Sequence, residues 1–179
     1  MQIYIKEVLN MDMHEPIMMS KFAIVYCGEE EQLSKDSIIQ MNLFAQKFSK
    51  ESVVNGNIIF TVISSPSVIC EQSTKIIKVN FSAKTKISSS QKKLSKGKQI
   101  PGKLIRTIHK KALGTDFLVI VIDDINFFYK FANYFTERYL GSCVNWPKSE
   151  ILAPAVLIID IEKNSYDQAI GIKRQKIII

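Results

Sequence analysis

The run Phe117–Ile122 constrains the fold more than any other part of this sequence. Six consecutive apolar residues are followed at once by Asp123 and Asp124. An apolar run of this length without alternation is typical of a central strand that is covered on both faces. It is too short to cross a bilayer, which takes about 18 or more apolar residues. The chain is therefore expected to build a sheet with helices packed against it.

Other apolar and β-branched runs predict further strands of the same sheet. They are Gln2–Leu9, Phe22–Tyr26, Ile58–Ile63, Lys75–Phe81, Ala155–Ile161 and Ile170–Ile179, with Val68–Cys70 as an additional short strand. In Lys75–Phe81 the residues alternate, so this strand is expected to have one wet, basic face. Ile170–Ile179 is expected to be an edge strand.

Helical periodicity appears in three places. Apolar residues recur at helical spacing over Leu33–Lys50, over Pro101–Leu113 and from Asp123 or Asp124 to Leu140. Strands that alternate with helices favour an α/β or α+β fold: one compact domain over residues 1–179, with a central mixed sheet of about five to seven strands flanked by about three helices. A polar, lysine-rich stretch at about residues 84–100 is predicted to be a mobile loop of this domain.

A signal peptide and a membrane-spanning segment are not expected from this sequence. Its first twenty residues hold four charged side chains and no apolar core of a signal peptide. Three scattered cysteines, Cys27, Cys70 and Cys143, are typical of a reducing compartment. We therefore expect an intracellular protein, cytoplasmic or nuclear. Cys27 is a candidate nucleophile if a base lies beside it, and otherwise a buried apolar thiol.

The distribution of charge is uneven. Residues 72–115 contain twelve of the 24 Lys and Arg residues and no Asp or Glu, whereas the rest of the chain has a net charge of −5. Such a segment favours an anionic partner, although a merely solvated basic face is the alternative.

The leading hypothesis from this charge distribution is a nucleic-acid-binding domain without sequence-specific readout. The predicted phosphate contacts are Lys84, Lys86, Lys92, Lys93, Lys96, Lys98, Lys103, Arg106, Lys110 and Lys111. Contacts to phosphates position a protein on nucleic acid but do not read its sequence. DNA and RNA are equally compatible with this pattern. The residues Gly97–Lys103 also match the start of a phosphate-binding loop, but Leu104 replaces the hydroxyl that would hold magnesium, so we interpret the match as chance.

The first alternative is a metal-dependent phosphodiesterase or nuclease. Asp123 and Asp124 are expected to end one strand, and Asp160 and Glu162 to end another. If these strands were parallel neighbours, their carboxylates would meet at one sheet edge and hold Mg²⁺. The competing interpretation is that Asp124 caps the following helix. No cofactor is predicted except magnesium under this alternative, and whether the chain is an enzyme stays open.

The second alternative is a structural or assembly subunit, for example of a viral or ribonucleoprotein complex. The apolar tail Ile177–Ile179 would be a sticky edge if it were left in solvent. It is expected either to pack on a protein partner or to complete the sheet of its own chain. No membrane partner is predicted.

Overall fold

The computed structural model describes residues 18–50, 59–81, 86–91, 108, 114–140, 152–163 and 169–178. The elements in these ranges are β1 (Met18–Tyr26), α1 (Lys35–Lys50), β2 (Ile59–Ser64), α2 (Val68–Phe81), β3 (Lys86–Gln91), β4 (Phe117–Ile122), α4 (Ile125–Leu140), β5 (Ala155–Lys163) and β6 (Ala169–Ile178). The strands form one mixed sheet in the order β3-β2-β4-β1-β5-β6. The α/β class and the single mixed sheet expected from the sequence are therefore confirmed.

Strand direction changes twice across the sheet, on either side of β5. β3, β2, β4 and β1 run parallel, whereas β5 is antiparallel to β1 and β6 is antiparallel to β5. The fully apolar strand β4 lies between β2 and β1, and all six of its residues are buried. This is the central position that its sequence predicts, because a strand covered on both faces has no side to leave polar.

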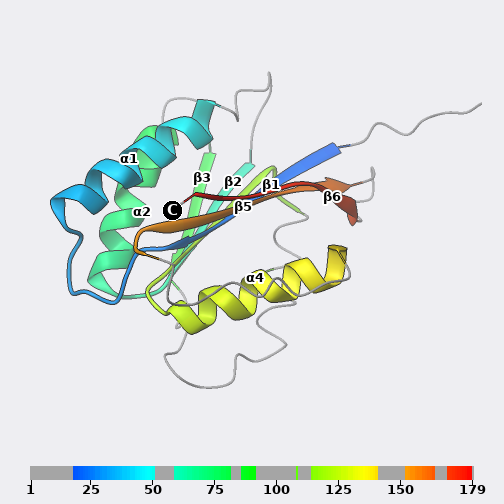
Figure 1. Ribbon diagram of the computed structural model, residues 1–179. Coiled ribbons are helices and arrows are strands. Elements are labelled where there is room, and N and C mark those ends of the chain that lie inside the picture. Colours follow the sequence, from blue (N-terminus) through cyan, green and yellow to red (C-terminus); the bar gives the residue numbers. More distant parts are fainter. Residues whose placement is uncertain are drawn as a thin grey trace, which may run out of the picture.

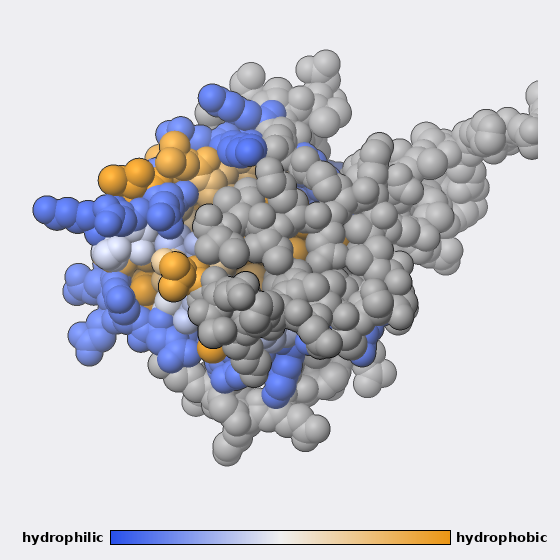
Figure 2. All heavy atoms as spheres, in the orientation of Figure 1, coloured by the Kyte–Doolittle hydropathy of each residue, from blue (hydrophilic) through white to orange (hydrophobic). Residues whose placement is uncertain are grey.

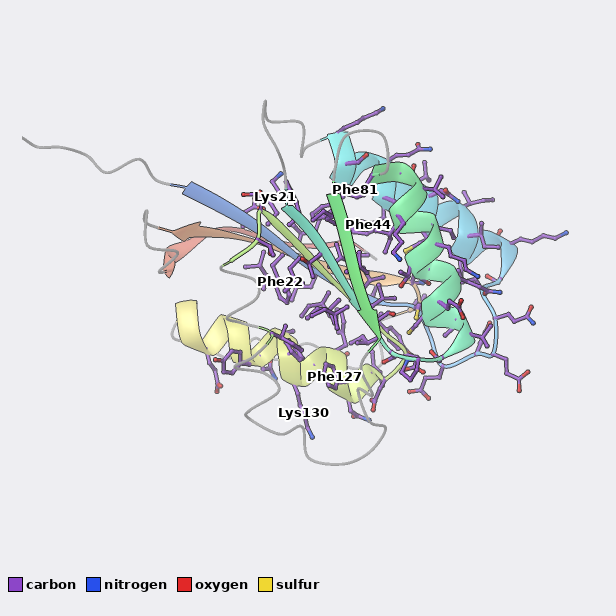
Figure 3. The ribbon with its side chains drawn as sticks, turned by 180° about the vertical axis from the view of Figure 1, so that it is seen from behind. Lys21, Phe22, Phe44, Phe81, Phe127 and Lys130 are labelled. Atoms are coloured by element: carbon purple, nitrogen blue, oxygen red, sulfur yellow. The ribbon has the colours of Figure 1, made fainter. Side chains whose placement is uncertain are left out.

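Helices cover both faces of the sheet (Figure 1). α1 and α2 lie together on one face, where Phe44 and Phe81 pack toward the sheet, and α4 lies on the other face with Phe127 (Figure 3). Alternate residues of each central strand enter the two cores. Phe22 of β1 joins the α4 core, whereas its neighbour Ala23 joins the core under α1 and α2. Ile108 is helical and fully buried in the α4 core.

The segment predicted as the strand Lys75–Phe81 is in fact the second half of helix α2. The alternation of apolar residues in this segment is misleading, because Val79 is 74% exposed. The residues that α2 buries are Ile69, Cys70, Ser73, Thr74, Ile77 and Phe81, which share one helical face. The helix also includes the predicted short strand Val68–Cys70. Both strand predictions are wrong.

The remaining predicted elements fall close to the observed ones. β1, β2, β4, β5 and β6 and helices α1 and α4 occupy the segments assigned to them. The strand predicted at Gln2–Leu9 lies outside the described residues, as does the helix Pro101–Leu113 except for Ile108. Within the stretch predicted as a loop at 84–100, Lys86–Gln91 form β3 and the other residues lie outside the described ranges.

The apolar tail completes the sheet of its own chain. Ile177 and Ile178 belong to β6 and are register partners of Leu157 and Val156 on β5. This arrangement is one of the two expected from the sequence, and it needs no partner chain to cover the backbone of β5.

The surface of the described residues mixes charged and apolar groups (Figure 2). The most exposed large apolar side chains on α1 and α2 are Ile39, Leu43, Val68 and Val79. In the part of the chain that the structure describes, no helix combines the length and apolar character needed to cross a membrane.

Candidate functional site

The connections of the sheet diverge between β1 and β4. These strands are parallel neighbours, but the chain leaves β1 into α1 on one face and leaves β4 into α4 on the other (Figure 1). In open α/β sheets, ligands bind outside the carboxyl ends of the strands at such a switch point. We therefore treat the residues that follow β1 and β4 as the candidate site and call this region the carboxyl edge.

Residues from the two strands leave the sheet side by side at the carboxyl edge. Tyr26 and Ile122 are the last register partners of the pair, so Cys27 and Asp123 follow them together. The Cys27 amide donates a hydrogen bond to the Ile122 carbonyl at 2.9 Å. Asp123 and Asp124 are both buried, as are Tyr26 and Cys27. The edge therefore gathers a phenol, a thiol and two carboxyl groups.

Gly28 makes the sharp exit from β1 sterically feasible. Its φ is +103°, a conformation that residues with a side chain rarely adopt, and a Cβ placed there would lie 3.1 Å from Ala153 Cβ. The close approach holds the chain after β1 against the residues that precede β5.

The end of β2 adds hydroxyl groups beside this edge. The Ser65 amide donates to the Val121 carbonyl at 3.0 Å, which ties the start of the β2–α2 connection to β4. Among the described residues, the buried hydroxyl oxygens of Ser65 and Ser67 have no hydrogen-bond partner. They lie just before the N-terminus of α2.

Asp124 is the N-cap of α4. Its Oδ1 accepts hydrogen bonds from the amide of Asn126 at 2.8 Å and from that of Phe127 at 3.3 Å. These bonds satisfy amide groups that have no partner within the helix. The competing interpretation of Asp124 made from the sequence, a helix cap, is the one that the geometry supports.

The electrostatic environment of the carboxyl edge is negative. The pKa of Tyr26 is raised to about 12, first by burial and then by the charges of Glu29, Cys27, Asp124 and Asp123. The sequence continues with the acidic run Glu29–Glu31, whose residues are exposed. Burial and nearby negative charge both disfavour the ionised phenol, so the raised pKa reflects first the burial of Tyr26 and then this field.

Cys27 is held as a neutral thiol. A hydrogen bond with Cys70, burial and the neighbouring Cys70 charge raise its pKa far above the ordinary range, and a hydrogen bond with Ser73 acts in the opposite direction. Its Sγ lies 3.2 Å from Cys70 Sγ and donates to the Ile122 carbonyl at 3.0 Å. Because the thiolate is the nucleophilic form of cysteine, this environment argues against the nucleophile predicted as one option from the sequence.

The three candidate metal-binding aspartates do not meet. Asp123 and Asp124 lie at the carboxyl edge, but Asp160 is the register partner of Lys21, near the start of β1. The hypothesis required parallel neighbouring strands, whereas β5 is antiparallel to β1 and β1 separates it from β4. In the described ranges, no group of three or more His, Cys, Asp or Glu side chains is placed to hold a metal ion.

Nearly all of the predicted nucleic-acid contacts lie outside the described residues. Only Lys86 falls within them, at the start of β3, and nothing is described of its side chain. The other described lysines of the acid-free segment, Lys75 and Lys78, lie on α2. Lys75 forms an ion pair with Glu71 at 3.3 Å.

The pair of Cys27 and Cys70 is the feature that the sequence interpretation missed. The two residues are separated by 43 positions, and Cys70 was assigned to a strand. The turn residues Ser65–Ser67 followed by Glu71 in the first turn are a helix-start signal, which would have assigned Cys70 to a helix but not placed that helix beside β1.

Comparison with known proteins was informative only at the level of structure. No family model matches the chain, and no curated protein matches its sequence. A solved structure from Nakamurella multipartitia that carries the name of phosphohistidine phosphatase SixA is similar with a TM-score of 0.56 at 6% identity, covering 90% of this chain and 98% of that one.

Two further solved structures have the same fold. A phosphoglycerate mutase from Plasmodium falciparum has a TM-score of 0.55 at 13% identity, over 88% of this chain and 90% of its own. The protein histidine phosphatase SixA complexed with tungstate has a TM-score of 0.52 at 14% identity, over 87% of this chain and 95% of its own. The chain therefore has the fold of these proteins, which we call the phosphatase fold.

These similarities correct the leading sequence hypothesis. The prediction of a nucleic-acid-binding domain with a nucleic-acid partner is wrong, because the similar structures are named as phosphatases and a mutase. The physical reason for the error lies in the charge argument, which bears on association with polyanions and not on the fold. Part of the basic segment forms the helix α2, whose inner face is core.

Proposed function

We propose that this chain is a binding protein built on the phosphatase fold, and that its carboxyl edge does not hydrolyse phosphate esters. The edge instead favours a ligand that carries positive charge. The proposal rests mainly on one observation, the negative field at the switch point between β1 and β4.

The buried carboxyl groups of Asp123 and Asp124 and the exposed run Glu29–Glu31 carry this argument, and the raised pKa of Tyr26 agrees with it. Burial and the acidic groups Glu29, Asp124 and Asp123 hold this pKa at about 12. Phosphoryl transfer requires the opposite field, because negative charge on the transferred group is stabilised by cations and hydrogen-bond donors. A phosphate dianion at this edge would be repelled by the same carboxylates that contribute to the raised pKa of Tyr26.

The thiol of Cys27, which directly follows β1, is also poorly suited to attack phosphorus. The Cys27 thiol donates a hydrogen bond to the Ile122 carbonyl and contacts the sulfur of Cys70. Its pKa is raised, so the thiolate is scarce at neutral pH. Asp124 is occupied as the cap of α4.

A direct test compares an organic cation with a phosphate analogue. Amide resonances of the isotopically labelled full chain would be followed by NMR while spermidine or tungstate is added. We expect spermidine to shift the amides of Gly28 and Asp124 in a saturable way at millimolar concentration, and tungstate to leave them unchanged. Asp123→Asn should weaken the spermidine effect severalfold, whereas Asp116→Asn, outside the carboxyl edge, serves as a matched control.

The opposite pattern would overturn the proposal. Saturable shifts with tungstate at the carboxyl edge, or no difference between Asp123→Asn and Asp116→Asn with spermidine, would show that negative charge does not govern this site.

Hydrolysis of phosphate monoesters is the second candidate function. It is favoured by the names of the proteins that share the fold and by the hydroxyl groups of Ser65 and Ser67 before the N-terminus of α2. A helix N-terminus with free hydroxyl donors can accept a phosphate group.

Turnover of p-nitrophenyl phosphate and of a phosphohistidine peptide separates the two candidates. We expect release of phosphate by the purified chain to equal that of a buffer blank. Turnover that is proportional to protein concentration and is lost in a Ser65→Ala, Ser67→Ala double variant would establish the second candidate in place of the first.

A further inference from the structure

Two buried thiols meet at the junction of β1 and α2. Cys27 follows the last residue of β1, and Cys70 lies in the first turn of α2. Their exposed fractions are 2% and 0%, and their sulfur atoms are 3.2 Å apart. Both cysteines are free thiols in this structure.

This contact is close to that of a disulfide. The sulfur atoms of a disulfide lie about 2.05 Å apart, so the pair must approach by only about 1.2 Å. The surrounding backbone holds the pair in place. The Cys27 amide donates a hydrogen bond to the Ile122 carbonyl. The Leu33 amide donates a hydrogen bond to Gln72 Oε1 at 2.9 Å, and this bond fixes the chain after β1 against α2.

We propose that Cys27 and Cys70 are a redox-active dithiol that forms a reversible disulfide between the end of β1 and the first turn of α2. With hydrogen peroxide as the oxidant, both S–H bonds break, one S–S bond forms, and the peroxide leaves as two water molecules. The thiols lose two electrons in total and the peroxide gains them. A thiol reductant such as dithiothreitol returns the pair to two thiols and is itself oxidised to a disulfide.

The environment of the pair determines how fast this reaction runs. Hydrogen bonding to Cys70 and burial raise the pKa of Cys27, so the reactive thiolate is scarce at neutral pH. Oxidation should therefore be slow at pH 7 and faster at pH 8.5. Slow formation distinguishes this pair from an exposed thiol that responds within seconds.

Formation of the disulfide would fix one side of the carboxyl edge. The cross-link joins residues separated by 43 positions, a segment that contains α1 and β2. Closing a loop of this length restricts the unfolded chain, and the melting temperature is expected to rise by roughly 5–10 °C. The inference does not depend on the proposed function, because neither the cross-link nor the melting temperature involves a ligand.

Peptide mapping of the full folded chain tests the pairing. The protein would be treated with hydrogen peroxide at pH 8.5, alkylated without reduction, and digested with trypsin. We expect the peptides 22–35 and 51–75, which hold Cys27 and Cys70, to appear as one cross-linked species. The peptide 139–148 with Cys143 serves as the internal control and should be recovered without a cross-link.

Matched variants complete the experiment. Cys143→Ser should keep both the cross-link and the rise in melting temperature, whereas Cys27→Ser and Cys70→Ser should lose both. Dithiothreitol should reverse the cross-link and the rise in melting temperature of the wild-type chain. This reversal needs no variant, so it tests the inference even if a variant fails to fold. The inference is overturned if the cross-link forms only in urea, or if Cys143 replaces either partner as the main product.

Discussion

Lys21 and Asp160 face each other across the antiparallel pair β1–β5. They are register partners, whereas Tyr26 at the other end of β1 is opposite Ala155. Asp160 therefore lies five strand positions away from the carboxyl edge, where Asp123 and Asp124 lie. This relationship separates the aspartates that the sequence suggested as one metal site.

The Lys21–Asp160 pair should be energetically coupled. Directly opposed residues of opposite charge in an antiparallel pair contribute about 0.2–1 kcal/mol. Lys21 is half-buried and Asp160 is buried, so solvent screens the pair less than it would at the surface. A double-mutant cycle with Lys21→Met and Asp160→Asn, measured by urea unfolding, should give a coupling energy of about 0.5 kcal/mol or more. Strictly additive single changes would contradict the assignment.

Loss of the α4 cap should destabilise the fold. Asp124→Ala removes the acceptor of the Asn126 amide and should lower the free energy of unfolding by about 1 kcal/mol. Asp124→Asn keeps a capping oxygen and should cost less. Thermal unfolding of the two variants checks this order, and equal losses would mean that Asp124 does not act as a cap.

The two residues Phe81 and Val79 of α2 provide a matched test of the core. Phe81 stacks on Phe60 with ring centroids 4.2 Å apart and is 6% exposed, whereas Val79 is 74% exposed. Phe81→Ala should cost about 3–5 kcal/mol through lost burial and the cavity that it leaves. Val79→Ala should stay within about 0.5 kcal/mol of the wild type. If this segment were the strand that its alternation suggests, with Val79 and Phe81 on one face, both changes would be costly.

Stability should fall in alkaline solution because of Tyr26. Its pKa is about 12 in the folded chain and has the ordinary value of 10.0 when unfolded. Between these values the folded chain holds a proton that the unfolded chain has lost, so unfolding becomes easier as pH rises. This group alone accounts for up to about 3 kcal/mol. Tyr26→Phe should flatten the dependence between pH 10 and 11.5, measured by urea midpoints, and an unchanged slope would exclude Tyr26 as its source.

The central strands could be predicted because their sequence leaves one choice. Phe117–Ile122 has no polar position, so only a strand buried on both faces accommodates it. The error at Lys75–Phe81 arose because a seven-residue window fits both periods. Including Ile69, Cys70 and Ser73 in the window shows the helical face of α2.

The candidate site could be predicted only in part. Asp123 and Asp124 were assigned correctly to the end of a strand, because local order along the chain is enough for that. Local sequence patterns do not give the direction of a strand in the sheet. Because β5 is antiparallel to β1, Asp160 lies away from the carboxyl edge. The contact between Cys27 and Cys70 also depends on the packing of α2 beside β1, to which no local pattern points.

The acidic character of the carboxyl edge is the central claim, and the change in the pKa of Tyr26 when one carboxylate is removed measures it most directly. The chain labelled with ¹³C at the tyrosine ring would be titrated by NMR, with Tyr26→Phe used to assign the resonance. We predict a pKa of about 12 for Tyr26, and a lower value in Asp123→Asn because one of the charges that raise it is removed. A wild-type pKa at or below 10 would contradict this account, since it would mean that positive charge dominates the edge, as phosphate chemistry requires.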